Sequence, residues 1–464
     1  MHAISQAMSA QAWDALGGEV SSLAALSFQS EGQLPSAFHV TDMAAAAIGV
    51  AGLALREWVC LHGEDAGAVC VDRRLASMWF HASLRPLGWV LPEPWDVMAG
   101  DYRARDGWIR LHTNAAAHRA AALRVLGPCT DRATVEAAVA RWYADTLEEA
   151  VIGEGGCAAT MRGIEDWRVH PQGQTLLAEP LVEQGLTPAG SDAWPPFVPG
   201  RPLAGIRVLD LTRVLAGPVA TRYLAGWGAD VLRIDPLAWE EPALVPELTP
   251  GKRCAYLDLR DATGRALFES LLRTCDVLVH GYRPGALDRL GYDAPARQQL
   301  RPGLVDVSLD AYGWTGPWAG RRGFDSLVQM SSGIAQAGMA RAGASNPRPL
   351  PVQALDQATG YLMAAAALRG LSARYRHGTG TMARLSLART AWWLIGAGSQ
   401  NDFGPLMPED ELDCGPNAEE TAWGPALRLR SPLEVGGRGL AFASPAVALR
   451  SSPAHWSASS GAAR

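Results

Sequence analysis

One carboxylate, Asp325, lies in a stretch whose composition suits covalent chemistry. Residues 313–333 read GWTGPWAGRRGFDSLVQMSSG, so a Gly/Pro/Trp turn cluster precedes the acid and an apolar run follows it. An Asp with a pKa of about 4 is ionised at neutral pH unless burial raises that pKa. Such a carboxylate attacks a reactive carbonyl without a partner base. The same residues also fit an Asp that caps a helix beginning at Ser326, so the local sequence leaves both roles open.

The composition predicts an ordinary globular enzyme. The chain has 464 residues, enough for two to three domains, with 48% hydrophobic and 19% charged residues. Its net charge of -6 and pI near 6.0 argue against a surface for nucleic acid or another polyanion. Among the 41 basic residues Lys252 is the only lysine, which makes that position conspicuous.

The cysteine pattern predicts free thiols in a reducing, cytoplasmic compartment. The seven cysteines form no CxxC pair and their number is odd. The three histidines His112, His118 and His170 match no metal-ligand spacing, and we predict no metal site. The first residues show no signal-peptide pattern, and the apolar stretch 44–55 is short for a membrane span, so no membrane partner is predicted.

The second half of the chain alternates strands and helices. Strands are predicted at 208–212, 229–235, 276–280 and 304–310, with helices at 219–228 and 262–275 between them. This alternation is typical of a doubly wound parallel sheet, so we predict an α/β fold over 203–400. Gly226 and Gly228 end a helix instead of beginning one, which excludes a dinucleotide-binding fingerprint there.

The first half predicts a smaller α+β domain. After an N-terminal segment 1–36, the region 37–190 begins with an Ala-rich helix that Asp42 would cap. A strand and helix at 67–77, a hairpin turning at Asp106-Gly107, a helix over 133–156 and an edge strand at 157–161 follow. The Pro-rich segment 191–202 reads as a linker, and 401–464 as a C-terminal segment with an irregular tail.

An internal repeat links the two halves. Residues 350–370 match 34–57, with Asp356 opposite Asp42, and residues 380–391 match 67–77. Two Ala-rich helices can look alike by composition alone. Because helix start, helix, gap and strand agree in order, we favour a duplicated module.

Several ordered motifs resemble the family III CoA-transferases, which include formyl-CoA transferase, carnitine CoA-transferase and α-methylacyl-CoA racemase. They are VLDLTRVLAGPVATRYLAGWGADVLRID, PGKRCAYLDLRDATGRALFESLLRTCDVLVHGYRPGALDRLGYD and VDVSLDAYGWTGPWAGRRGFDSLVQMSSGIA, and the resemblance ends near Thr390. Residues 34–190 resemble the later part of the family, including its small domain. The order therefore suggests a duplication in which each copy lost a complementary part.

The resemblance implies covalent transfer of coenzyme A from an acyl-CoA to a carboxylic acid. In the family an aspartate attacks the acyl-CoA thioester, the mixed anhydride reacts with the released CoA, and the resulting aspartyl-CoA thioester passes CoA to the acceptor. That aspartate falls on Asp325 within GRRGFD, which favours the nucleophile over the helix cap. CoA and acyl-CoA would be substrates, with no resident cofactor. Family members form interlocked homodimers, so a homodimer is expected, and the duplicated Ala-rich helices leave open whether it is interlocked.

The resemblance also implies a set of CoA contacts, with Lys252 and Arg289 at phosphates. The positions are Val214, Leu215, Ala216, Lys252, Gly281, Tyr282, Arg283, Arg289, Ala311, Tyr312 and Gly313. Three departures weaken the match. Pro236 follows the second strand where many members place a glutamate and a basic residue, Gly281 replaces a common asparagine, and Asp310 would repel a phosphate.

Two other functions stay open. The family's racemases use a His together with the Asp, yet no His occurs between His280 and His377, and Phe324 precedes Asp325 where racemases commonly have His. These absences favour transfer over racemisation or isomerisation at the α-carbon. The rearranged halves also leave open a non-catalytic CoA-binding subunit, since fold alone does not establish activity.

Overall fold

A mixed sheet of seven strands forms the body of the protein. The computed structural model describes residues 2–190, 193–400 and 404–457. The strand order is β10-β9-β8-β11-β12-β13-β7, parallel except for the antiparallel edge strand β7. The bounds are β7 Glu183–Ala189, β8 Arg207–Leu211, β9 Asp230–Asp235, β10 Lys252–Tyr256, β11 Val277–His280, β12 Val305–Asp310 and β13 Thr379–Ser386.

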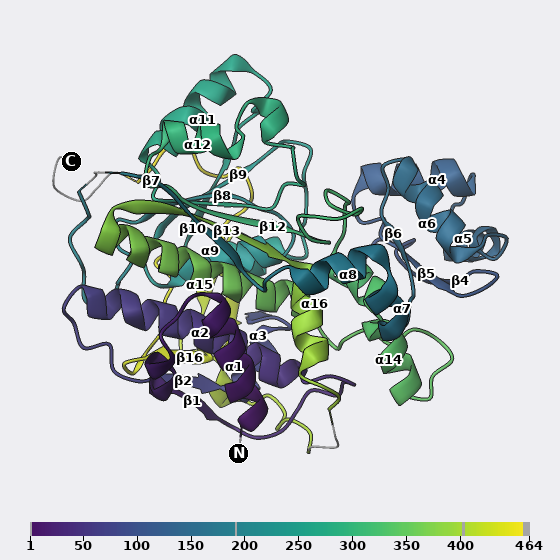
Figure 1. Cartoon of the computed structure of the whole chain (residues 1–464), viewed down its shortest axis with the longest axis horizontal. Helices are drawn as coiled ribbons and strands as arrows, with labels where there is room; N and C mark the ends of the chain where they lie inside the picture. The colour runs from purple at the N-terminus through teal and green to yellow at the C-terminus, as the bar shows by residue number, and fades with distance from the viewer. Residues whose placement is uncertain (1, 191–192, 401–403, 458–464) are drawn as a thin grey trace.

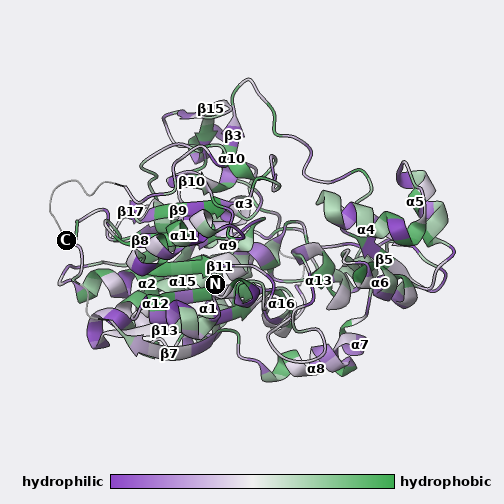
Figure 2. Ribbon diagram, turned by 90° about the horizontal axis from the view of Figure 1, so that it is seen from above, coloured by the Kyte–Doolittle hydropathy of each residue, from purple (hydrophilic) through white to green (hydrophobic). Residues whose placement is uncertain are grey.

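Helices cover both faces of this sheet (Figure 1). One face carries α9 Ala216–Gly226 and α15 Ala354–His377, and the other carries α11 Ala262–Thr274 and α12 Ala294–Leu300. Helix α2 Val40–Leu61 packs on α15, one layer further from the sheet. Alternate strand residues point to opposite faces: Val208 packs in the core with α15, whereas Leu209 packs in the core with α11. Figure 2 shows many of the hydrophobic residues in these strands and in the helices beside them. The predicted doubly wound α/β architecture is confirmed.

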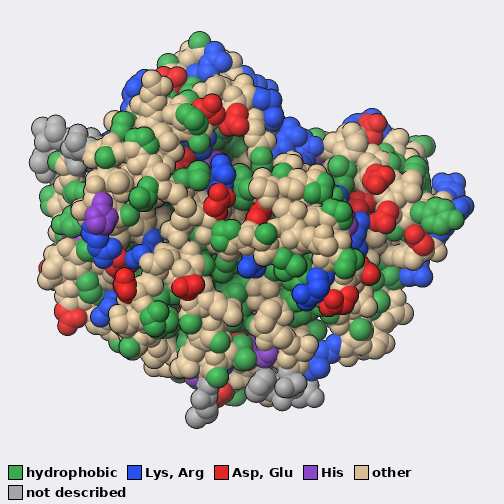
Figure 3. Space-filling view, in the orientation of Figure 1, with side chains coloured by type: hydrophobic (Ala, Val, Ile, Leu, Met, Phe, Trp, Pro, Cys, Tyr) green, Lys and Arg blue, Asp and Glu red, His purple; other side chains and the backbone are tan. Residues whose placement is uncertain are grey.

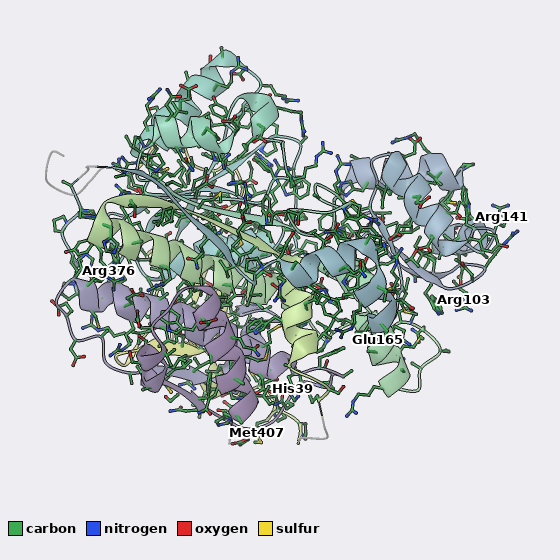
Figure 4. All side chains as sticks on the ribbon, in the orientation of Figure 1. His39, Arg103, Arg141, Glu165, Arg376 and Met407 are labelled. Atoms are coloured by element: carbon green, nitrogen blue, oxygen red, sulfur yellow. The ribbon has the colours of Figure 1, made fainter. Side chains whose placement is uncertain are left out.

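The Ala-rich helices α2 and α15 lie side by side and run in the same direction. Near their C-terminal ends Glu57 of α2 pairs with Arg369 and Arg376 of α15, and Figure 4 labels Arg376 at this end. Small side chains let the two backbones approach closely. Helix α2 is long and apolar enough to cross a membrane, but most residues of its apolar stretch are buried inside the described part of the protein.

Both segments that match in sequence fold as a helix, a strand and a second helix. The number of residues between Asp42 and Asp356 equals that between Asp72 and Ser386. Asp72 and Ser386 each cap the helix that follows their strand. The repeated elements are α2, β2 Val69–Asp72 and α3 Arg73–Trp79 in the first copy, and α15, β13 and α16 Leu387–Gly396 in the second. Asp42 does not cap α2 as predicted. His39 precedes the helix, and Asp42 lies in its first turn, 3.0 Å from the Arg73 guanidinium.

A small unit projects beside the main body (Figure 1). It comprises β4 Gly100–Arg103, β5 Trp108–Leu111, β6 Ala158–Thr160, α4 Ala116–Leu126, α5 Arg132–Val139 and α6 Ala144–Gly153. The hairpin and the edge strand are confirmed, and Figure 4 labels Arg103 and Arg141 at the outer end of the unit. The single helix expected over 133–156 is wrong. The chain turns between α5 and α6, and the Asp106 carboxylate accepts the Ala144 N–H at 2.9 Å.

The C-terminal segment pairs with the first copy. Strand β16 joins β2, and β15 joins β3, while residues 440–457 contain neither helix nor strand. The remaining bounds are α1 Ala3–Ala15, η1 Val20–Ala25, β1 Leu26–Gln29, β3 Leu84–Pro86, α7 Ile164–Val169, α8 Pro171–Ala178, α10 Val245–Leu248, η2 Asp288–Leu290, α13 Asp325–Ser331, α14 Ile334–Arg341, η3 Glu411–Asp413, β14 Glu419–Thr421, β15 Gly424–Arg428, β16 Leu433–Val435 and β17 Arg438–Gly439. Within the predicted linker, residues 193–202 contain no helix or strand, and residues 191–192 lie outside the described part.

The contact between α15 and α9 depends on Gly360. A Cβ at this position would lie 2.5 Å from the Ala216 carbonyl oxygen, which is main chain and cannot rotate away. We expect Gly360→Ala to lower the free energy of unfolding by about 1–3 kcal/mol, measured by urea titration. Gly396→Ala is the control, since its Cβ would meet nothing within 4 Å. Equal stability of the two variants would contradict this packing.

Candidate functional site

A cavity of about 400 Å³ opens at the carboxyl ends of the parallel strands. The strand order reverses between β8 and β11, and open α/β sheets bind ligands at such a reversal. Its walls come from the turns after β8, β11, β12 and β13, from the glycine loop before α13, and from the small unit. From the side of Figure 1, the space-filling view shows a hollow between the lobe of α11 and α12 and the small unit, with basic side chains at its edge (Figure 3).

About half of the expected contact residues reach this cavity. Those that line it are Val214, Ala216, Gly281, Tyr282, Arg283 and Ala311. Those that do not line it are Leu215, Lys252, Arg289, Tyr312 and Gly313. Tyr312 is buried, with its hydroxyl 3.0 Å from that of Ser331, and Gly313 takes a φ of 101° beside Glu179. Tyr312 and Gly313 therefore shape the turn after β12.

Lys252 lies in the protein interior and not in the cavity. Its ammonium has no exposed surface and lies 3.2 Å from the Asp210 carboxylate, 2.6 Å from the Thr221 hydroxyl and 2.9 Å from the Pro218 carbonyl oxygen. Burial lowers the pKa of Lys252 to about 8, and the Asp210 carboxylate opposes the shift. The expected phosphate contact is therefore not available in this structure. The lysine instead ties β10 and β8 to the start of α9.

Asp310 does line the cavity, but not as the repulsive anion that the sequence suggested. One carboxyl oxygen accepts the Gly313 N–H at 2.7 Å, and the other has no partner among the described residues. Burial raises the pKa of Asp310 well above its usual range, and the Glu179 carboxylate adds to this effect. Both effects favour the protonated, uncharged form of Asp310, which weakens the repulsion of a phosphate that the sequence suggested.

Three guanidinium groups of the cavity wall have no carboxylate within ion-pair distance in the described chain. Arg213 lies between the Trp239 and Tyr282 rings, 4.9 and 5.0 Å from their centroids. Arg283 and Arg322 line the same cavity, and Arg322 donates to a main-chain carbonyl of the small unit at 2.6 Å. Unpaired guanidinium groups around one opening favour an anionic ligand.

Asp325 begins α13 but caps another helix. Its carboxylate accepts the main-chain N–H of Asp356, in the first turn of α15, at 2.9 Å, and it also accepts the Gln329 side-chain amide. The expected alternative, a cap on its own helix, is wrong because Phe324 holds that position and no side chain caps α13. The exposed fraction of Asp325 is 0%. Burial raises the pKa of Asp325 to about 6, although these hydrogen bonds favour the anion and act to lower the pKa.

Asp356 is the carboxyl group that reaches the cavity. It lines the wall and is 7% exposed. Burial and the neighbouring Asp325 charge both raise the pKa of Asp356 well above its usual range. Burial and repulsion between the two carboxyl groups both oppose a second negative charge on the pair. Sequence reasoning placed Asp356 only in the repeat, because nothing local shows that its helix starts against Asp325.

The small unit brings two histidines to the loop before Asp325. The His112 ring stacks on Phe324 with centroids 3.8 Å apart, and His118 meets the same ring edge-on at 5.8 Å. His118 also lines the cavity, and burial lowers its pKa to about 4, so its imidazole is neutral. The sequence offered no signal for this contact, because the histidines and Phe324 are distant in the chain.

An ion pair fixes the same loop to the small unit. The Arg321 guanidinium lies 2.8 Å from the Glu148 carboxylate and 3.6 Å from the Trp318 ring centroid. No group of His, Cys, Asp and Glu side chains within the described ranges could hold a metal ion. The site therefore consists of a carboxyl pair, a neutral imidazole and unpaired guanidinium groups around one cavity.

Comparisons with known proteins give a match over the segment that contains most of this site. Residues 203–423 match the family model described as CoA-transferase family III. The mouse protein named succinyl-CoA:glutarate CoA-transferase is 34% identical over 195 residues, covering 39% of this chain and 44% of the relative. A Fusarium pseudograminearum protein named acyl-CoA transferase is 30% identical over 216 residues, covering 42% and 46%.

Among solved structures, Rv3272 from M. tuberculosis is 30% identical, with a TM-score of 0.40, and the match covers 42% of this chain and 57% of that one. The chain spans about half the length of the curated relatives it matches. Residues 203–423, which contain Asp325 and Asp356, belong to CoA-transferase family III.

Proposed function

We propose that the protein transfers coenzyme A from an acyl-CoA thioester to a carboxylic acid. The observation that carries this proposal is the Asp325 carboxylate beside a cavity at the sheet's reversal point, within the segment that matches the family. Relatives named succinyl-CoA:glutarate and acetyl-CoA:oxalate CoA-transferases point to short acids as the first substrates to test.

The cavity wall suits the phosphates and the pantetheine arm of CoA. Arg213, Arg283 and Arg322 would meet phosphates, since guanidinium groups bind them in bidentate fashion. The turns after β8, β11 and β12 would contact the rest of CoA through Val214, Ala216, Gly281, Tyr282 and Ala311. Leu215, which does not line the cavity, would hold the turn after β8 in place. Lys252, Tyr312 and Gly313 would act by shaping these turns, and Arg289, on the exposed surface after β11, would meet a phosphate outside the cavity.

Asp325 would act as the nucleophile. Its carboxylate oxygen attacks the thioester carbonyl, and the oxyanion that forms needs N–H donors such as those of the glycine loop before Asp325. The mixed anhydride then reacts with the released CoA to give an aspartyl-CoA thioester, from which the acceptor acid takes CoA. Since Asp325 has no exposed surface, acylation requires that part of its cover, which includes Phe324, moves aside.

We further infer a homodimer in the cytoplasm. All seven cysteines are free thiols, which supports a reducing compartment. The homodimer follows from the family resemblance alone.

The first prediction concerns the covalent intermediate. Incubation with succinyl-CoA or acetyl-CoA should give an acyl- or CoA-sized mass increase on the peptide that contains Asp325. The acylation rate should rise from pH 5 to pH 7 with a midpoint near 6, because burial raises the pKa of Asp325 to about 6 and the nucleophile must lose its proton. Asp325→Asn should abolish the adduct.

Asp293→Asn serves as the matched control, since Asp293 is exposed and caps α12 away from the cavity. Normal adduct formation in Asp325→Asn would exclude Asp325 as the nucleophile. CoA binding without any adduct in the unaltered protein would favour a non-catalytic CoA-binding subunit.

A second function is favoured by one observation, the His118 imidazole in the cavity wall. Proton exchange at the α-carbon of an acyl-CoA needs two acid–base groups, and a neutral His together with a carboxyl group supplies them. For this function, deuterium from the solvent should enter the α-carbon, and His118→Ala should abolish that exchange. His81→Ala, at an exposed histidine, is the control. Absence of deuterium in the recovered acyl-CoA would rule this function out.

A further inference from the structure

Asp356 lies beside the proposed nucleophile, Asp325, in a position that suits a second reacting group. Its main-chain N–H donates to the Asp325 carboxylate at 2.9 Å, so the two residues are fixed next to each other across the α13–α15 contact. Asp356 lines the cavity, whereas Asp325 has no exposed surface. A substrate in the cavity therefore meets the Asp356 side chain on its way to Asp325.

The internal repeat provides a comparison for this carboxyl group. In the first copy Asp42 is fully partnered: it lies 3.0 Å from the Arg73 guanidinium, and it accepts the Ser5 hydroxyl at 2.6 Å and the Gln33 amide at 2.8 Å. Burial opposes ionisation of Asp42, but these hydrogen bonds and the Arg73 charge hold its pKa below the usual range. The first copy thus favours the ionised form of its acid.

In the second copy the position of Arg73 is taken by Leu387. Both residues follow directly on the helix-capping residue at the end of the repeated strand. Leu387 lines the cavity and carries no charge, and no ion pair to Asp356 is present within the described residues. The charge nearest to Asp356 is that of Asp325, and burial acts with this charge to raise the pKa of Asp356. The second copy thus lacks the cation that favours the anion in the first copy, and its surroundings favour the protonated acid.

We propose that Asp356 is the acid–base partner of Asp325 in the transfer reaction: its carboxyl group protonates the departing CoA sulfur and later takes that proton back. This inference rests on the proposed function. It adds a second catalytic carboxyl group to the nucleophile that the family resemblance implies.

The proton balance of the first step follows from the shared charge. An Asp325 oxygen bonds to the thioester carbonyl carbon, the carbon–sulfur bond breaks, and its electron pair stays on sulfur. The Asp356 proton moves to that sulfur, so CoA leaves as a thiol. Acylation removes the charge of Asp325, and the repulsion that kept Asp356 protonated disappears at the same moment. The pair carries one negative charge before and after the step.

The second step reverses the proton transfer. The CoA sulfur attacks the Asp325 carbonyl carbon of the anhydride, and the Asp356 carboxylate takes the thiol proton. The bond from that carbonyl carbon to the oxygen it shares with the acyl group breaks, and the donor acid leaves as a carboxylate. The position of Asp356 in the first turn of α15 stabilises its anion between the two steps.

The test compares Asp356→Asn with Asp325→Asn and with the Asp293→Asn control. Release of CoA thiol in a single turnover with succinyl-CoA, and the acyl-enzyme mass, are followed from pH 5 to pH 9. The charged groups that act on the pair are the carboxyls themselves and Arg110 of β5. Loss of a general acid should slow acylation by about 10²- to 10⁴-fold, and the fall in rate at high pH should disappear, since Asp356 no longer titrates.

Asp356→Glu separates chemistry from folding. It keeps the acid and should restore part of the rate and the fall at high pH, which a purely structural role would not do. The melting temperature of Asp356→Asn should stay close to that of the unaltered protein, since the amide replaces a protonated carboxyl with an uncharged group of similar size.

The outcomes are distinct. In one outcome Asp325→Asn forms no adduct, while Asp356→Asn keeps the rate and pH profile of the unaltered protein. This outcome overturns the role of Asp356 and leaves the proposed function standing. An adduct in Asp325→Asn but not in Asp356→Asn makes Asp356 the nucleophile and overturns the assignment of both residues. No adduct in the unaltered protein overturns the proposed function, and the inference falls with it.

Discussion

The hydrogen bond from the start of α15 to the Asp325 carboxylate is the contact on which the site depends. It places a buried carboxyl at the N-terminus of a long core helix, where free N–H groups stabilise its anion. The same bond holds Asp356 beside Asp325, so capping the helix and pairing the two acids are one structural event. Burial and mutual repulsion both oppose a second negative charge, so the pair favours a form in which one of the two acids keeps its proton. A cavity wall built on this helix start therefore carries an acid that can change its protonation state.

The repeated helix–strand–helix unit shows how one backbone supports two electrostatic environments. Both copies place an Asp in the first turn of an Ala-rich helix and a capping residue at the end of the following strand. One residue after that cap, Arg73 neutralises Asp42 in the first copy, whereas Leu387 leaves Asp356 without a cation in the second. The first copy thus has a structural ion pair, and the second has a titratable group at a cavity. Packing of α2 on α15 joins the two copies through small side chains that carry no charge near either acid.

The small unit completes the site from a distant part of the chain. Its histidines pack on Phe324, and Glu148 holds Arg321 of the glycine loop. These contacts cover Asp325 and bring His118 into the cavity, which restores an acid–base group that the sequence around Asp325 lacks. The two proposed functions, CoA transfer and α-carbon exchange, would use the same cavity with different partners for the carboxyl pair.

The sequence by itself determined the doubly wound sheet, the repeat and the segment around Asp325, because periodicity, turn residues and motif order are local properties. Six of the contact positions that the family resemblance implies also line the cavity at the strand ends: Val214, Ala216, Gly281, Tyr282, Arg283 and Ala311. Only the tertiary structure decided that Lys252 is buried against Asp210, that burial raises the pKa of Asp310, and that Asp325 caps α15. Burial and the identity of the nearest charge decide these states, and both depend on which distant segments pack together, which no local pattern encodes.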